Sequence, residues 1–434
     1  MNFSLATRAL RSRNYKLFFT GQGISLIGTW MTRIATSWLV YRLTGSAALL
    51  GLVGFAGQIP AFVLGPVAGV WVDRRNRHRT IVVTQILSML QSFALAVLAL
   101  AHIITVWEIV VLALAQGIIN AFDMPARQSF VIQMVDQRED LPNAIALNSS
   151  IVNASRLIGP AIAGIVVAAV GEGYCFLLDG ASYIAVIVSL LMMRVASNAA
   201  PKPQRHIVHE LIDGWRYVTD SVPIRSILLN LSIVSLFGMP YSVLMPIFAA
   251  RVLGGGAHTL GFLMGAVGVG ALGGALGLAA RKSVIGLGSR IFATTGVFGL
   301  ALVGFALSHW LWLSMLLLPV VGFGMMQQMA ASNTVLQTIV DDERRGRVMA
   351  FYSMAIQGMA PFGSLIAGST AGRVGAPVTV LGSGIACVLG AIWFRSRLPR
   401  IREVVRPVYV RMGILPEIAT GVQQASALTE PPET

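Results

Sequence analysis

The charged residues that this sequence places inside apolar stretches are those that could do chemistry. Arg33 stands in TWMTRIATS, Arg156 in IVNASRLIGP and Asp179 in CFLLDGASY. An ionisable group in such surroundings loses solvation, so it usually binds a ligand, carries a proton or neutralises a partner. The two arginines could therefore attract an anionic or polar substrate, and Asp179, or Asp123 in the stretch NAFDMPA, could take up and release a proton.

Three further charged residues are candidates for substrate or proton binding. Glu108 lies near the start of the apolar run 104–124, whereas Asp123 and Arg127 flank its end. We expect Glu108 to reach water, and Asp123 and Arg127 to serve structure or gating. For Arg33 and Arg156 the sequence leaves an alternative open, namely a fixed ion pair with a nearby acid.

Uncharged polar residues offer a second set of candidates. The stretch GFGMMQQMAASNT contains Gln327, Gln328 and Asn333 beside several methionines. Methionine side chains adapt to irregular apolar ligands, which is consistent with a bulky substrate. Helix packing explains the same methionines equally well.

The sequence contains no pattern typical of an enzyme. It has no phosphate-binding loop, no metal-type cluster of Cys and His, and no nucleophile with a recognisable base. Its two cysteines, Cys175 and Cys387, lie far apart in apolar segments and are expected to be small packing residues. We therefore predict no enzymatic activity, no metal and no cofactor, and no ATP-driven pump.

Composition indicates which elements must position these residues. The chain of 434 residues is 55% hydrophobic and 12% charged, with a mean hydropathy of +0.74. Such a composition is typical of a protein embedded in a lipid bilayer, where about 20 apolar residues form one spanning helix. We predict an all-α integral membrane protein with twelve transmembrane helices, at 16–41, 47–72, 79–101, 104–124, 142–170, 173–194, 226–250, 259–281, 286–307, 309–332, 347–372 and 376–396.

The distribution of Lys and Arg orients these spans. The loops on one side hold only Arg42, Arg251 and Arg373, while the loops on the other side and both termini hold nearly all the rest. Because basic residues collect in cytoplasmic loops, both termini are expected in the cytoplasm. Topology thus explains the net charge of +14 without a nucleic-acid partner.

The chain divides into two halves. We predict a six-helix half at 1–196, a cytoplasmic linker at 197–225, a second six-helix half at 226–398, and a disordered tail at 399–434. Within the linker, Leu211, Trp215 and Val218 recur at helical spacing, which predicts an amphipathic helix at the membrane interface.

An internal repeat relates the halves. The stretch IGPAIAG at 158–164 matches FGSLIAG at 362–368, and each follows a charged loop. Two six-span halves related by an axis along the membrane normal are a recurring transporter architecture, with the substrate path between them.

A loop motif carries a family resemblance. In GPVAGVWVDRRNRHRT, the residues Gly69, Asp73, Arg74, His78 and Arg79 occupy positions of the signature G-x-x-x-D-R-x-G-x-[RK]-[RK]. The chain therefore resembles the major facilitator superfamily. In that family the Asp and the basic residues latch the two halves in the outward-open state, which implies a latch of Gly69, Asp73, Arg74 and Arg79.

Residue 76 departs from the signature, because Asn76 replaces the usual Gly. Asn is the non-glycine residue that best tolerates positive φ, so we expect the tight turn to be kept.

Span five resembles the antiporter pattern G-x8-G-x3-G-P-x2-G-G through Gly159, Pro160 and Gly164, which implies a bend. Small residues could equally serve helix packing alone. In span four, Ala113 replaces the arginine of R-x-x-Q-G, so the usual proton-coupling arginine is absent.

Several longer segments, among them WLVYRLTGSAALLGLVG and ERRGRVMAFYSMAIQGMAPFGSLIAG, resemble the branch of the enterobactin exporter and related efflux permeases. The resemblance implies proton-driven export of a siderophore, drug or similar amphipathic molecule across a bacterial inner membrane by a monomer. An uptake symporter of the same fold is the alternative. A non-transporting sensor or scaffold would need an additional soluble domain.

Overall fold

The computed structural model describes residues 7–194, 207–281 and 283–412, and this part of the chain folds into helices without a strand. Ten of its helices are long and apolar enough to cross a membrane. The predicted all-α membrane fold is confirmed. The predicted spans 16–41 and 347–372 are also helical but are not among those ten, so the number twelve remains a prediction.

The first half of the chain forms helices close to the predicted spans. They are η1 (Arg8–Arg11), α2 (Arg13–Thr44), α3 (Ala47–Ala56), α4 (Ile59–Asp73), α5 (Arg77–Leu100), α6 (Val106–Met134), η2 (Arg138–Asp140), α7 (Leu141–Val170) and α8 (Glu172–Leu191). Gly45 ends α2 with φ of 60°, a conformation that favours glycine. The predicted span 47–72 is interrupted between α3 and α4, and α6 continues through Pro125 beyond the predicted end at 124.

The second half is less regular than predicted. It comprises α10 (Val222–Ile233), η3 (Val234–Gly238), α11 (Tyr241–Ile247), η4 (Phe248–Val252), α12 (Ala257–Ala279), α13 (Leu287–Leu307), α14 (Leu311–Ile339), α15 (Asp342–Ser353), η5 (Met354–Gly358), α16 (Met359–Val374) and α17 (Ala376–Arg411). The elements η3, η4 and η5 are π-helical turns, which often occur at functional sites. They interrupt the predicted spans 226–250 and 347–372.

The prediction of a disordered tail at 399–434 is wrong for its first part, because α17 continues through Pro399 and Pro407 to Arg411. Leu398, Ile401 and Val405 recur at helical spacing and are buried in one apolar cluster, which keeps the helix in place. Residues 413–434 lie outside the described residues.

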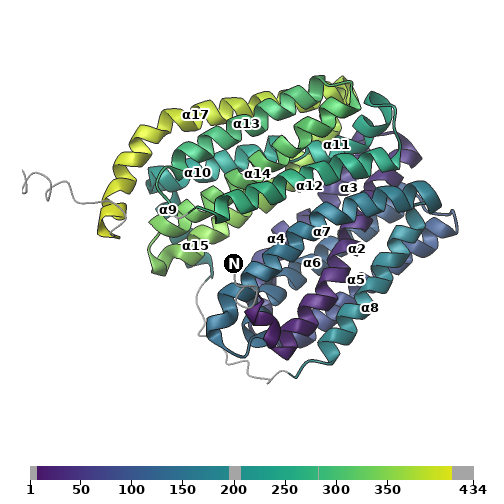
Figure 1. Ribbon diagram of the computed structural model, residues 1–434, viewed down its shortest axis with the longest axis horizontal. Helices are drawn as coiled ribbons and strands as arrows, with labels where there is room; N and C mark the ends of the chain where they lie inside the picture. Colours follow the sequence, from purple (N-terminus) through teal and green to yellow (C-terminus); the bar gives the residue numbers. More distant parts are fainter. Residues whose placement is uncertain (1–6, 195–206, 282, 413–434) are drawn as a thin grey trace, which may run out of the picture.

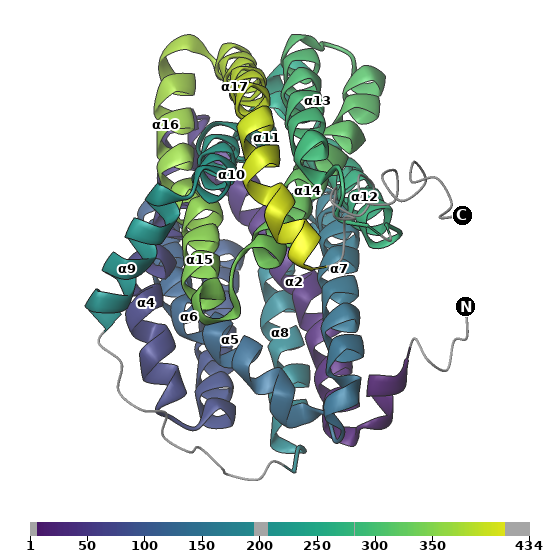
Figure 2. The same ribbon diagram turned by 90° about the vertical axis from the view of Figure 1, so that its left-hand side faces the viewer.

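The helices form two groups that follow the chain order, α2–α8 and α10–α17. Figure 1 shows the two groups in contact at one end and diverging toward the other, where α15 lies. We call the diverging end, which contains α9 (Ile207–Asp220), the linker end and the opposite one the far end. Figure 2 looks onto the linker end, with α9 and α15 beside each other.

Glycines bring the two groups together near the far end. A Cβ on Gly164 in α7 would lie 2.9 Å from the Cα of Gly261 in α12, and one on Gly51 in α3 would lie 2.9 Å from the Cα of Gly368 in α16. Both crossings therefore need glycine on each side. Gly164 and Gly368 are the last residues of the two repeated sequence stretches, so the repeat appears in the structure as two equivalent crossings.

The linker helix α9 packs on α15. The rings of Trp215 and Phe351 lie 6.0 Å apart, and the guanidinium of Arg344 lies 4.7 Å from the centre of the Tyr217 ring. The predicted helix in the linker is thus present. Residues 197–206, its first part, lie outside the described residues.

Candidate functional site

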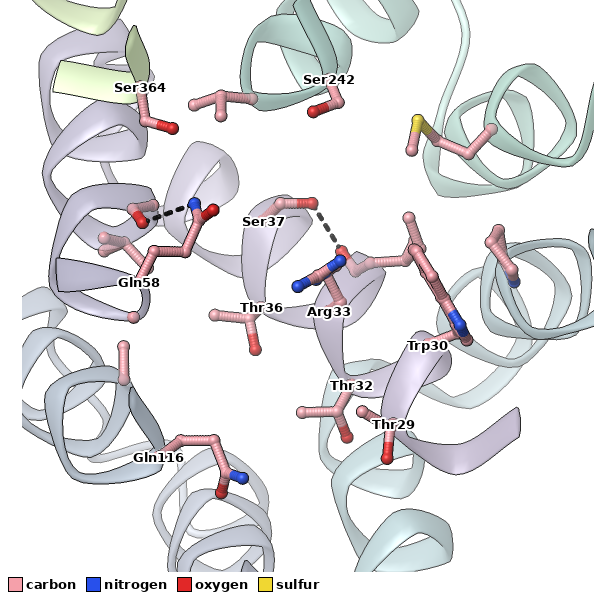
Figure 3. A pocket seen from close by; sticks show the side chains of 18 of the residues that line it. Thr29, Trp30, Thr32, Arg33, Thr36, Ser37, Gln58, Gln116, Ser242 and Ser364 are labelled. Atoms are coloured by element: carbon pink, nitrogen blue, oxygen red, sulfur yellow. Dashed lines mark hydrogen bonds between the residues drawn. The ribbon is translucent and has the colours of Figure 1, made fainter. Parts of the chain in front are cut away.

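A cavity of about 380 Å³ lies between the two groups of helices. Figure 3 shows residues of α2, α6, α11 and α16 around it, together with Gln58 from the turn between α3 and α4. Its labelled polar lining comprises Thr29, Thr32, Arg33, Thr36, Ser37, Gln58, Gln116, Ser242 and Ser364. The volume falls in the range of about 300–1,000 Å³ that is usual for ligand pockets.

Arg33 and Arg156 both line this cavity, and both lie against the indole of Trp30. The guanidinium carbon of Arg33 is 4.9 Å from the ring centre, and that of Arg156 is 5.7 Å away. Figure 3 shows Arg33 beside Trp30 at the middle of the site, and its side chain is exposed to the cavity. Within the described part of the chain neither arginine has an ion-pair partner, so the alternative of a fixed ion pair is not realised in this conformation.

The position of Trp30 depends on a close approach of α2 and α7. A Cβ on Gly159 would lie 3.0 Å from the carbonyl oxygen of Ile27 and would clash with the Cβ of Trp30. Pro160, the next residue, lines the cavity. The glycine and proline predicted for an antiporter bend thus lie beside the Arg33–Trp30–Arg156 group.

Asp179 lies at the edge of the cavity and is 1% exposed. Its Oδ2 accepts hydrogen bonds from the hydroxyls of Thr32 and Ser92, each at 2.8 Å. Its Oδ1 has no hydrogen-bond partner among the described residues, and a Cβ on Gly28 would lie 2.6 Å from it. Asp179 is thus a buried carboxyl with one free oxygen, which is a suitable arrangement for carrying a proton.

Asp123 is held differently, although it also lies in an apolar helix. It forms an ion pair with Arg127 one helical turn away. Its Oδ1 accepts hydrogen bonds from Thr84 at 2.7 Å and from Gln85 at 2.9 Å. Neither Asp123 nor Arg127 lines the cavity, and the contacts favour the structural role for this pair.

Glu108 and Gln327 lie away from the cavity. Glu108 caps the start of α6 by accepting a hydrogen bond from the backbone N–H of Thr105 at 2.8 Å. Gln327 is buried, donating to the carbonyl of Gly274 at 2.7 Å and accepting from Arg290 at 2.8 Å. These contacts fix helix ends and helix packing.

Gln328 and Asn333 also do not line the cavity. Gln328 is fully buried, and its amide has no hydrogen-bond partner among the described residues, whereas Asn333 accepts a bond of 2.6 Å from Gln337. Trp30 was not predicted to line the cavity, although its position three residues before Arg33 puts both on one helix face. Met239 and Met264 were not predicted either, and the sequence offers no signal that distinguishes them.

The predicted latch residues lie at the linker end, where α4 meets α5. Gly69 has open space around it, and Arg74 and Arg79 are exposed. The backbone of Asp73 ends α4, but its side chain is outside the described part of the structure.

The tight turn between α4 and α5 is kept as expected, but Asn76 does not adopt a positive φ in it. Its φ is −68°, and its side chain caps α5 by accepting a 3.0 Å hydrogen bond from the N–H of Arg79. Asn serves here as a helix cap, a role for which it is well suited.

Comparison with known protein families gives one match over nearly the whole chain. Residues 5–424 match a family described as transmembrane secretion effector.

Individual proteins give similar results. The chain is 26% identical to a staphyloferrin A transporter of Staphylococcus aureus over 89% of this chain and 97% of that one. It is 27% identical to a multidrug efflux pump, Tap, of Mycolicibacterium fortuitum over 87% of this chain and 93% of that one. Among solved structures, a POT family transporter in complex with 5-aminolevulinic acid superposes with a TM-score of 0.72 at 11% identity, covering 90% of this chain and 97% of that one. This last likeness concerns the fold alone.

Proposed function

The chain belongs to the transmembrane secretion effector family of the major facilitator superfamily, and from that membership we propose that it exports a small organic molecule by proton antiport. It is an efflux-type membrane transporter and not an enzyme. The names of its relatives support a siderophore, a drug or a similar amphipathic compound as the substrate.

The observation that carries this proposal is the cavity between two groups of helices that touch at the far end and diverge at the linker end. Such a device works by rocking its halves about a central site. We assign the linker end to the cytoplasm of a bacterial inner membrane, because the basic loops lie there. In this orientation the present conformation receives its substrate from the cytoplasm, which is the direction that export requires.

We assign the coupling proton to Asp179. Asp123 is neutralised by Arg127, whereas Asp179 lacks an ion-pair partner within the described residues and borders the cavity. In an export cycle Asp179 takes up a proton while the far end is open and releases it to the cytoplasm while the linker end is open.

We further propose that Gly69, Asp73, Arg74 and Arg79 form the latch that closes the linker end in the opposite conformation. These residues belong to the end that is divergent here, which is consistent with an unlatched state. We expect a monomer to be sufficient, because the cavity is built from one chain.

Transport into inside-out vesicles tests the proposal. The lumen is made acidic, and a panel of siderophores and antibiotics is offered from outside. Antiport predicts accumulation that stops when nigericin collapses the pH gradient. Accumulation that persists without the gradient would contradict proton antiport, and accumulation only in right-side-out vesicles with an acidic exterior would identify an uptake symporter.

A further inference from the structure

The cavity presents positive charge to whatever enters it. Its charged lining consists of Arg33, Arg156 and Asp179. The carboxylate of Asp179 is 1% exposed and is held by Thr32 and Ser92, whereas the guanidinium of Arg33 is exposed to the cavity. A ligand therefore meets cations before it meets the acid.

The electrostatic stabilisation of these cations is incomplete. Within the described residues neither Arg33 nor Arg156 has a carboxylate within ion-pair distance, and both rely on the face of Trp30. A cation–π contact contributes about 0.5–2 kcal/mol, while removing an ion from water costs several kcal/mol. An anion in the cavity would supply the missing charge, and guanidinium groups bind carboxylates and phosphates through paired hydrogen bonds.

The wall of the cavity that the second group of helices forms is uncharged. Met239, Met264 and Met325 come from the second group of helices and line the cavity without charge. The two walls meet where Nη2 of Arg156 lies 3.9 Å from the sulfur of Met325. Methionine side chains accommodate apolar groups of irregular shape.

We propose that the exported molecule is an organic anion whose acidic groups bind Arg33 and Arg156 of the first half, while its apolar body packs on the three methionines of the second half. The proposal rests on the proposed transport function and specifies the substrate class of that site. The substrate is thereby given an orientation in the cavity as well as a negative charge.

Equilibrium binding to the purified full-length chain tests this inference without any proton gradient. Two fluorescent probes share a xanthene ring system but differ in charge: fluorescein is a dianion near neutral pH, and rhodamine 123 is a cation. Fluorescence anisotropy should give an affinity for fluorescein at least about tenfold higher than for rhodamine 123, since one charge-assisted contact is worth a factor of this order.

Variants connect that preference to the named residues. Arg33→Gln and Arg156→Gln should each weaken fluorescein binding about tenfold and leave rhodamine 123 binding unchanged or stronger. Arg33→Lys should retain most of the preference, because it keeps the charge. Met264→Ala should weaken both probes by the same factor, because they share the apolar ring system.

Arg251→Gln is the matched control, since Arg251 carries the same charge but lies near Tyr41 and Gly45, away from the cavity lining. It should leave both affinities unchanged. Equal affinities for the two probes, no fluorescein binding, or fluorescein binding that survives both Arg→Gln changes would overturn the inference. Proton antiport would remain open in those cases, because the vesicle assay measures it separately.

Discussion

At the scale of single residues, two guanidinium groups meet at the indole of Trp30, and one buried carboxyl borders the same cavity. Arg33, Arg156 and Asp179 could be predicted because a charge in an apolar helix is costly, and all three line the cavity. Gln327 and Gln328 do not line it. Their position could not be predicted because α14 is apolar nearly all round, so periodicity does not indicate which of its sides faces the cavity. Arg156 and Arg33 contact the same indole, that of Trp30, because α7 packs against α2. No local sequence pattern predicts this packing.

Asp179→Asn should uncouple transport from the proton gradient. The amide keeps the size of the side chain and can still accept hydrogen bonds from Thr32 and Ser92, but it cannot bind and release a proton. We expect gradient-driven accumulation to fall at least about tenfold, as for loss of an acid–base group, while exchange of labelled for unlabelled substrate continues.

Glu108→Gln is the control for that experiment, because Glu108 caps α6 outside the cavity lining. It should keep gradient-driven accumulation. Unchanged accumulation in Asp179→Asn would remove this residue from the coupling mechanism.

The Asp123–Arg127 pair should behave as a structural unit. Arg127→Gln leaves a buried carboxylate with only Thr84 and Gln85 as partners, at a cost of about 2 kcal/mol after allowance for the partial exposure of Arg127. Thermal unfolding in detergent should therefore show a lower Tm for Arg127→Gln than for the double variant Asp123→Asn/Arg127→Gln. If the stability losses of Asp123→Asn and Arg127→Gln added up to the loss of the double variant, the two residues would not be coupled.

At the scale of elements, the apolar runs predicted where helices lie, and the exceptions have physical causes. The span predicted at 104–124 ends just before Pro125, and the predicted disordered tail begins at Pro399. Both α6 and α17 continue through these prolines because buried apolar residues recur on the far side of each. The π-helical turns η3, η4 and η5 interrupt predicted spans, and the apolar periodicity of the sequence does not indicate them. For the glycine crossings, the motif indicated Gly164, but its partner Gly261 became evident only in three dimensions.

Gly164→Val should weaken the far-end contact between the halves. The added side chain has no space, because a Cβ already lies 2.9 Å from the Cα of Gly261 and from the carbonyl oxygen of Ala257. Spin labels on the far-end loops, at Ile103 and His309, should report a longer distance by pulsed electron resonance. Gly273→Val is the matched control, since a Cβ there meets open space and should leave the distance unchanged; an unchanged distance in Gly164→Val as well would show that the crossing does not hold the far end closed.

At the scale of the whole molecule, the internal repeat predicted two related halves, and the crossings of α7 with α12 and of α3 with α16 are its counterpart. The sequence could not indicate which conformation the chain adopts, because a transporter sequence must be compatible with more than one. In this conformation the two groups of helices are in contact at the far end and diverge at the linker end. Export then requires the far-end contacts to separate in every cycle.

A reversible disulfide across the far end tests that requirement most directly. A Cβ on Gly372 lies 3.9 Å from the Cβ of Ala48, within the range of about 3.5–4.5 Å found in disulfides. The variant Ala48→Cys/Gly372→Cys is made with the buried free cysteines Cys175 and Cys387 replaced by alanine. In inside-out vesicles with an acidic lumen, the oxidised variant should lose accumulation and dithiothreitol should restore it, while each single-cysteine variant transports in both conditions. Transport by the fully cross-linked protein at the rate of the reduced protein would contradict the account.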